Sequence, residues 1–224
     1  MQHQPSFTRN NDIVVLKLYG RPGWGSVIVE AQLDWYGLAY TFEEVDDLFA
    51  SAAARAALAA INPLSQIPTL VLNDGAVLTE SAAITLYLAD ITGRYDLVPT
   101  PSDVERALFF RWLIFLVANV YPTYTYADVP ARFVTDENAQ DGFRAAVDAY
   151  AQMLYRELDT AASAPWFLGH RFSALDIYIC AMTKWRPRHK WFAANTPKLQ
   201  AIALAAEKLD ALKSCFEWNV LDLT

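Results

Sequence analysis

Three short features of the sequence carry residue types that can bind or react. The X-Pro bond Ile67-Pro68 can adopt the cis form at a cost of about 0.5–1 kcal/mol over trans. Glu80-Ser81 stands at the start of a predicted helix, where unpaired N–H groups and the positive end of the helix dipole attract anions. Ser26 offers a hydroxyl at the start of an earlier predicted helix. The chain therefore holds candidate groups for binding an anion and for hydroxyl-based chemistry.

Each feature also has a purely structural interpretation. Pro68 can be an ordinary trans proline that ends a loop. Ser81 can be a simple helix cap. By the residue preferences at helix N-caps, Thr79 is as good a cap. Ser26 can also serve only as a cap. The residues alone leave these alternatives open.

The first part of the chain alternates between strand and helix patterns, and the strands and helices that these patterns predict would position the residues named above. β-Branched and aromatic side chains at 13–19 predict a buried strand, and Gly37 predicts the end of the helix that Ser26 begins. Asp74-Gly75 predicts a hairpin turn. The order predicts a small α/β sandwich with parallel first strands and an antiparallel edge. The further expected elements are strands at 40–45, 69–72 and 76–78 and helices at 47–61 and 80–91.

The second part of the chain shows only helical patterns, and Ser173 with Asp176 has the spacing of a capping box. A proline-containing stretch at 97–102 indicates a linker. We expect helices at about 103–124, 136–162, 173–185 and 197–214. The predicted division is a tail at 1–12, an α/β domain at 13–93, a linker at 94–102 and an all-helical domain at 103–224.

The amino-acid composition excludes several classes of protein for this chain. Hydrophobic residues make up 54% and charged residues 19%, which is enough apolar material for a core. The net charge of -7 and the absence of a basic patch argue against a nucleic-acid partner. Cys180 and Cys215 are read as buried thiols, and no cluster predicts a metal site. Without an apolar run of membrane-spanning length or a signal peptide, we expect a cytoplasmic protein with no membrane contact.

Four segments resemble one known family, the cytosolic glutathione transferases. Residues 62–70 (NPLSQIPTL) are similar to the family's N-P-x-G-x-V-P-x-L, and 78–84 (LTESAAI) are similar to L-x-E-S-x-A-I. Residues 167–176 (FLGHRFSALD) resemble F-L-x-G-x-x-x-S-x-A-D, and 18–26 (LYGRPGWGS) resemble the first strand and loop of bacterial members. The resemblance implies a thioredoxin-like domain followed by an all-α domain, which is the glutathione transferase fold.

The resemblance also implies a glutathione site. In the family the peptide at Ile67-Pro68 is cis, which frees the backbone of Ile67 to pair with the cysteinyl part of glutathione. The γ-glutamyl carboxylate would bind the hydroxyl and N–H of Ser81, and Glu80 would hold the α-amino group. Gln66 could add one hydrogen bond. Glutathione would be a co-substrate, with no metal involved.

Activation of the thiol is implied at the start of the first helix. Lowering a thiol pKa by two units needs roughly 2.7 kcal/mol, and one hydrogen bond to a charged acceptor supplies about 1.5–3. The Ser26 hydroxyl therefore suffices as the catalytic group. Gly25 stands where the bacterial P-G-A-C-S pattern has cysteine, and the zeta-type S-S-C-S pattern is absent. The backbone N–H groups of Gly25 and Ser26 are the alternative, and Arg55 is the cation available for the glycine end.

A pocket for an electrophile is expected from aromatic residues. Trp24 could cover the thiol, and Tyr121, Tyr124 and Trp185 fall where the family binds its second substrate. Such a lining favours a flat apolar electrophile, although ordinary packing is an equal alternative. We therefore expect a homodimeric detoxification enzyme that conjugates glutathione to a hydrophobic electrophile. A glutathione-dependent peroxidase or lyase and a non-catalytic binding or regulatory protein are the alternatives.

Overall fold

The computed structural model describes residues 16–219. The predicted tail at 1–12 and the first residues of the strand predicted at 13–19 lie outside this range. Strand β1 (Leu16–Gly20) pairs in parallel with β2 (Tyr40–Glu44) and antiparallel with β3 (Thr69–Val71), which pairs antiparallel with β4 (Val77–Leu78). The sheet order is β2-β1-β3-β4. The predicted parallel start and antiparallel edge are both confirmed.

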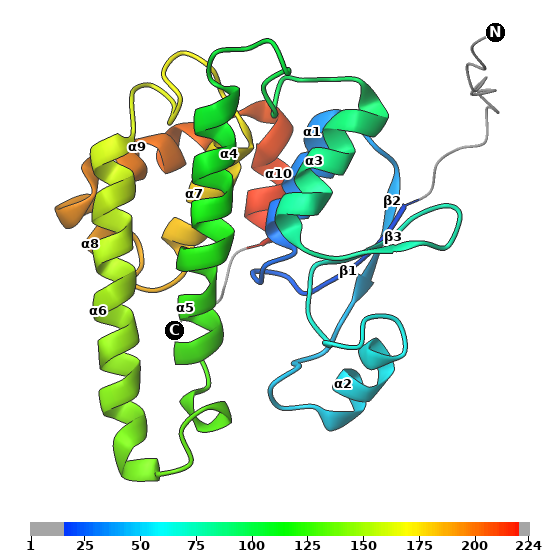
Figure 1. Cartoon of the computed structure of the whole chain (residues 1–224). Helices are drawn as coiled ribbons and strands as arrows, with labels where there is room; N and C mark the ends of the chain where they lie inside the picture. Colours follow the sequence, from blue (N-terminus) through cyan, green and yellow to red (C-terminus); the bar gives the residue numbers. More distant parts are fainter. Residues whose placement is uncertain (1–15, 220–224) are drawn as a thin grey trace, which may run out of the picture.

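Three helices accompany this sheet. Helix α1 (Val27–Tyr36) and α3 (Ser81–Thr92) lie between the strands and the remaining helices, while α2 (Ala52–Ala59) lies apart at one end of the sheet (Figure 1). Helix α1 ends as predicted at Gly37, whose φ of 65° a glycine adopts without steric cost. Helix α2 is shorter than predicted. The Asp47 carboxylate accepts the N–H groups of Phe49 and Ala50 and so forms a turn before the helix.

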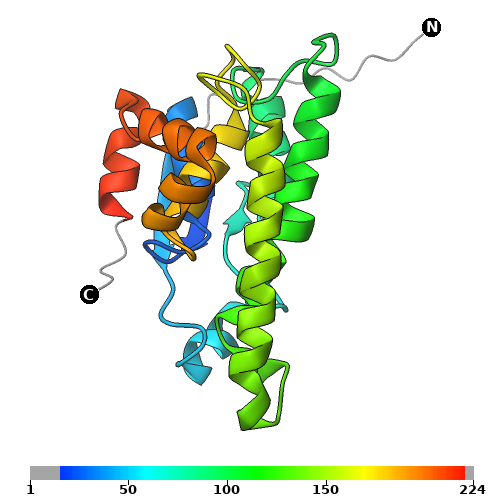
Figure 2. The ribbon, with the colours of Figure 1, turned by 90° about the vertical axis from the view of Figure 1, so that its left-hand side faces the viewer.

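The other helices form the second half of the molecule. Helix α6 runs alongside α5 (Figure 2). The predicted helix at 103–124 contains a π-helical segment, Leu116–Val120, between α4 and α5. The predicted helix at 197–214 is two helices, since Leu209 is extended. The helices are α4 (Arg106–Phe115), α5 (Tyr121–Ala127), α6 (Glu137–Ala161), α7 (Ala174–Lys184), α8 (His189–Asn195), α9 (Pro197–Ala206) and α10 (Asp210–Trp218).

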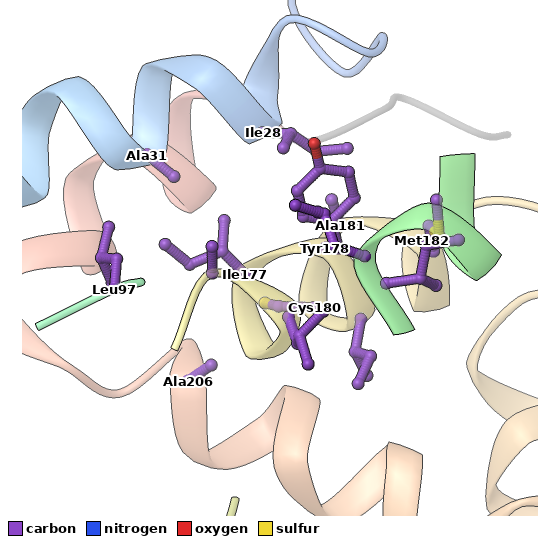
Figure 3. Packing of buried hydrophobic residues seen from close by; sticks show 14 of the residues in the cluster. Ile28, Ala31, Leu97, Ile177, Tyr178, Cys180, Ala181, Met182 and Ala206 are labelled. Atoms are coloured by element: carbon purple, nitrogen blue, oxygen red, sulfur yellow. The ribbon is translucent and has the colours of Figure 1, made fainter. Parts of the chain in front are cut away.

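The two halves share one hydrophobic core. Helix α7 is its centre, because every residue from Ala174 to Thr183 is buried. Ile28 of α1 lies against Tyr178 of α7 in the close view of Figure 3, where the core continues from one half to the other. The predicted capping box is confirmed. The Asp176 carboxylate accepts the Ser173 N–H at 2.8 Å and the Phe167 N–H at 2.8 Å.

The helical stretch Arg106–Ala127 is long and apolar enough, by length and composition, to cross a membrane. A helix was predicted at about 103–124, but no apolar run of membrane-spanning length was found in the sequence. The stretch is a weak indication on its own, because core helices of helical bundles have the same composition. Part of this stretch packs against α7 and α6.

Candidate functional site

The loop between β1 and α1 is the first wall of the candidate site. Ser26 is buried, and its hydroxyl accepts the Arg21 N–H and donates to the Arg21 carbonyl, both at 3.1 Å. Ser26 stands at the predicted N-cap position of α1, but its side chain makes no capping hydrogen bond. The Ser26 side chain lies on the strand side of the loop, because a Cβ added to Gly20 would be 2.5 Å from its oxygen. This geometry argues against a contact between the hydroxyl and a bound thiol.

Gly25 faces the opposite way. A Cβ added here would lie 1.8 Å from the hydroxyl oxygen of Tyr121 and 3.4 Å from the carbonyl oxygen of Ile67. Gly25 thus brings the loop, the proline segment and α5 together. Within residues 16–219, the N–H groups of Gly25 and Ser26 have no hydrogen-bond partner, as is usual at the start of a helix.

The segment before β3 is the second wall. The Ile67-Pro68 peptide is cis. Neither the N–H nor the C=O of Ile67 is paired within the described part of the chain, and Ile67 is only half-buried. An unpaired backbone donor and acceptor at an accessible place can pair with an extended peptide. Gln66 precedes Ile67 and was predicted to add one hydrogen bond to the ligand. Its side chain is exposed.

Asn62 holds this segment in place, and sequence reasoning missed it. Its Nδ2 donates to the Gln66 carbonyl and to the Thr69 hydroxyl, both at 3.0 Å, while its Oδ1 accepts the Leu64 N–H at 3.1 Å. Thr69 also donates to the Gln66 carbonyl at 2.7 Å. The signal available in the sequence was an Asn before Pro63, a residue type that bonds to nearby backbone in turns.

The start of α3 is the third wall. Ser81 is the first residue of this helix, and Glu80 precedes it with a φ of 66°, a strained value for a non-glycine residue. Neither Glu80, Ser81 nor Thr79 caps the helix with its side chain, whereas the Glu80 carbonyl accepts the Ile84 N–H at 3.0 Å. The N–H groups that precede Ile84 in the helix are unpaired among the described residues. They and the helix dipole suit a carboxylate.

Three of the four predicted aromatic residues form one cluster. The Tyr121 ring stands edge-on to Tyr124 at 6.2 Å and to Trp185 at 5.8 Å, and these last two are 5.1 Å apart. The Tyr124 hydroxyl is turned into the helical core, where it contacts the Tyr155 hydroxyl and donates to the Arg186 carbonyl at 3.1 Å. Tyr124 therefore supports the cluster from behind.

Trp24 makes its aromatic contacts elsewhere. Its ring stacks on Phe49 at 5.1 Å and lies 5.6 Å from the guanidinium of Arg21. Arg132, from the helical half, lies 5.4 Å over the other ring of this pair, that of Phe49. Arg55 is engaged, since it donates to the carbonyls of residues 48 and 49 at 2.7 and 3.2 Å. Arg132 was not singled out in the sequence, and no local signal there marks it.

The C-terminal part of the chain clamps the first loop. The Trp185 indole donates to the Gly23 carbonyl, and the Gly23 N–H donates to Asn219 Oδ1, both at 2.8 Å. Asn219 Nδ2 in turn donates to Glu30 at 3.2 Å. Burial raises the pKa of Glu30, whose other oxygen has no partner in the described structure. These residues fix the position of the loop.

Other reactive groups lie away from these walls. Cys180 and Cys215 are buried, and burial raises the pKa of both thiols, so neither is an accessible nucleophile. Within residues 16–219 no three His, Cys, Asp or Glu side chains are grouped as metal ligands. The walls formed by Gly25, Ile67 and Ser81 are therefore the main candidate site.

Comparisons with known proteins identify the family of this chain. The family model described as glutathione S-transferase, N-terminal domain, matches residues 28–91. An uncharacterized GST-like protein of Escherichia coli K12, YncG, is 40% identical over 206 residues, which cover 92% of this chain and 98% of that protein. Glutathione S-transferase GstA of Escherichia coli O157:H7 is 28% identical over 170 residues, 76% of this chain and 82% of that protein.

A solved structure gives the same result for the fold. A glutathione transferase homologue from Sulfitobacter, crystallised with bound glutathione, has a TM-score of 0.82 and 25% identity, and covers 93% of this chain and 100% of its own. The α/β half of the present structure is thus a thioredoxin-like unit, and the second half is the helical unit that accompanies it. This chain belongs to the glutathione S-transferase family.

Proposed function

We propose that this chain binds glutathione and adds the glutathione thiolate to a hydrophobic electrophile. The observation that carries the proposal is the unpaired backbone of Ile67, which lies beside Gly25 and offers one donor and one acceptor. Glutathione is an extended peptide with carboxylates at its ends, and the N-terminus of α3 adds an anion site to the peptide site.

The first two parts of glutathione have clear partners. The cysteinyl part pairs with the N–H and C=O of Ile67, next to Pro68. The γ-glutamyl carboxylate binds the N–H groups and hydroxyl at Ser81, and the Glu80 carboxylate holds the α-amino group. The Gln66 side chain is exposed and adds a hydrogen bond.

The glycine end takes a cation from the helical half. Arg55 is occupied by two backbone carbonyls, so its guanidinium is less available. Arg132 lies over Phe49 and is exposed. We assign the glycyl carboxylate to Arg132, because a planar guanidinium binds a carboxylate through two parallel hydrogen bonds.

The electrophile lies against the aromatic cluster. Tyr121 and Trp185 present ring surface, with Tyr124 behind them, and Trp24 covers the thiol from the side of Phe49. Ring faces and edges of this kind bind flat apolar molecules.

Activation of the thiol by the Ser26 hydroxyl is opposed by its hydrogen bonds with Arg21. The backbone N–H groups of Gly25 and Ser26 are better placed, because they lie at the positive end of α1 and are unpaired in the described structure. The chain then activates the thiol partly through backbone groups, with Ser26 holding the loop.

The same proposal includes a homodimer that acts in detoxification in the cytoplasm. Large apolar side chains are exposed on α4, β4 and α3, and burial against a second copy would remove them from water. They are Val77, Ile91, Leu108 and Ile114.

A second candidate is a binding or regulatory protein that holds glutathione without catalysis. The engagement of Ser26 and the lack of a side chain at Gly25 favour it. A glutathione-dependent peroxidase or lyase would use the same peptide site and differ only at the aromatic cluster.

The test is calorimetric titration with glutathione, followed by a conjugation assay with an activated aryl chloride. We expect binding and turnover, and a tenfold or greater loss of affinity in Ser81→Ala, since a hydrogen bond to a charged group contributes about 1.5–3 kcal/mol. The exposed Ser163→Ala is the matched control. Absence of binding at millimolar glutathione rejects the proposal, and binding without turnover selects the second candidate.

A further inference from the structure

Gly25 and Tyr121 compete for one position. A Cβ on Gly25 would lie 1.8 Å from the Tyr121 hydroxyl oxygen and 3.1 Å from its ring carbon Cζ. No side chain at position 25 fits while the Tyr121 ring is in place. The phenol of α5 therefore occupies the volume that a side chain at the start of α1 would otherwise fill.

The Tyr121 ring is held rigidly in this position. Tyr124 and Trp185 meet it edge-on at interplanar angles of 81° and 80°. Both supporting rings are themselves anchored, Tyr124 through the Arg186 carbonyl and Trp185 through the Gly23 carbonyl. A ring fixed by anchored neighbours presents its hydroxyl in a constant direction.

The Tyr121 hydroxyl is unused. Within residues 16–219 it forms no hydrogen bond, and it is not among the fully buried unpaired polar atoms. Ser26 and Tyr124 differ from it, because their hydroxyls are bonded to the protein. The free hydroxyl lies near Gly25 and the Ile67 carbonyl, where the cysteinyl part of a bound glutathione lies in the proposed function.

We propose that Tyr121 donates its hydroxyl hydrogen bond to the sulfur of glutathione and so replaces the side chain missing at position 25. The inference rests on the proposed binding of glutathione. On binding, the thiol releases its proton to solvent, and the phenol keeps its own proton and stabilises the thiolate. The sulfur then uses its electron pair to form a bond to the electrophilic carbon, and the leaving group departs with its bonding pair.

The surroundings keep the phenol protonated. Burial is the main cause of the raised pKa of Tyr121, and Tyr178, Asp128 and Glu80 add to it from α7, from the end of α5 and from the start of α3. A phenol with a raised pKa is a donor at neutral pH and not a general base. A hydrogen bond of this kind to a charged acceptor shifts a thiol pKa by roughly one to two units.

The first test is Tyr121→Phe. The ultraviolet absorbance of the thiolate, followed against pH in the glutathione complex, gives the pKa of the bound thiol. We expect this pKa to rise by about one to two units, and kcat/KM at neutral pH to fall roughly 10- to 100-fold and to recover in alkali. Tyr126→Phe, on the exposed side of the same helix, is the control and leaves both unchanged.

Calorimetry separates the two proposals. Binding of glutathione by the variant with an unshifted thiol pKa overturns the role of Tyr121 and leaves the proposed function intact. Absence of binding by the unaltered chain overturns both.

An exchange of positions provides a second test. Gly25→Ser alone should lose activity and stability, because its side chain meets the Tyr121 phenol. Gly25→Ser combined with Tyr121→Ala supplies a hydroxyl from α1 and removes the obstruction, so the thiol pKa should fall back below that of Tyr121→Ala alone. Full activity and stability in Gly25→Ser would contradict the competition between the two residues.

Discussion

The indole N–H of Trp185 donates a hydrogen bond of 2.8 Å to the carbonyl oxygen of Gly23. Asn219 receives the N–H of the same glycine at 2.8 Å. Both polar groups of Gly23 are thus held by residues that follow α7 and α10. The loop that leads into α1 therefore takes its shape from the helical half of the molecule.

Trp185→Phe should destabilise the protein. The substitution keeps an aromatic ring and leaves the Gly23 carbonyl without its donor, which costs about 1–3 kcal/mol. Urea unfolding measures the change in the free energy of unfolding. The control is Trp218→Phe, because Trp218 is 58% exposed. Equal stability of the two variants would show that the indole bond contributes nothing.

Asp176→Asn should also be strongly destabilising. The carboxylate accepts the N–H groups of Phe167 and Ser173, and an amide would turn an NH₂ group toward one of them. We expect a loss of about 2–4 kcal/mol in the free energy of unfolding, from the cap and from an unpaired buried donor. Asp210→Asn, in the exposed first turn of α10, is the matched control.

Glu30→Gln should flatten the dependence of stability on pH. Burial, the largest cause, raises the pKa of Glu30 above its ordinary value of 4.5. Above that value the unfolded chain loses this proton first, so the stabilisation present in acid is lost as the pH rises through the folded pKa. Burial raises the pKa of Asp176 to about 6 and adds a slope of the same sign.

The Glu30→Gln variant should therefore keep only the part of the dependence of stability on pH that Asp176 contributes. At neutral pH it should unfold at a higher denaturant concentration than the wild type. Chemical unfolding between pH 4 and 8 gives both curves. Parallel curves would mean that Glu30 has the same pKa in the folded and unfolded states.

Two glycines should respond to alanine in opposite directions. A Cβ on Gly20 would lie 2.4 Å from the Ser26 Cβ and 2.8 Å from the Phe42 ring, whereas a Cβ on Gly142 would meet nothing within 4 Å. Gly142→Ala, inside α6, should stabilise the protein by about 0.5–1 kcal/mol. Gly20→Ala should destabilise it by about 1–3 kcal/mol through overpacking. Thermal unfolding of both variants tests the sign of each change.

Local signals predicted much of the fold. Gly37 ends α1, Ser173 and Asp176 form the capping box, and Asp74-Gly75 turns the chain between β3 and β4. Each depends on groups a few residues apart. The start of α2 was missed because the Asp47 carboxylate captures backbone N–H groups that the helix would otherwise use. The split between α9 and α10 depends on one extended residue, and no strong breaker announces it.

In the candidate site, too, features within one short segment were predictable from the sequence, and features that join distant segments were not. The segments around Ile67 and Ser81 were recognisable because each lies in a short continuous motif that resembles one of the family's. The relation between Gly25 and Tyr121 was not, since the two residues come from different halves and meet only after the core has formed. Ser26 has the residue type of a reactive group, but its hydroxyl is taken by backbone that the sequence alone does not place beside it.

The π-helical segment Leu116–Val120 directly precedes Tyr121. In an α-helix each residue advances the direction of its side chain by about 100°, so one residue more or fewer re-aims everything that follows. Deleting a single residue from this segment would leave α4 packed against α7 and turn the Tyr121 phenol away from Gly25. The π-helical segment thus sets the direction in which the Tyr121 side chain points. An insertion or deletion of one residue there should alter the chemistry of the proposed site without changing any of its residues.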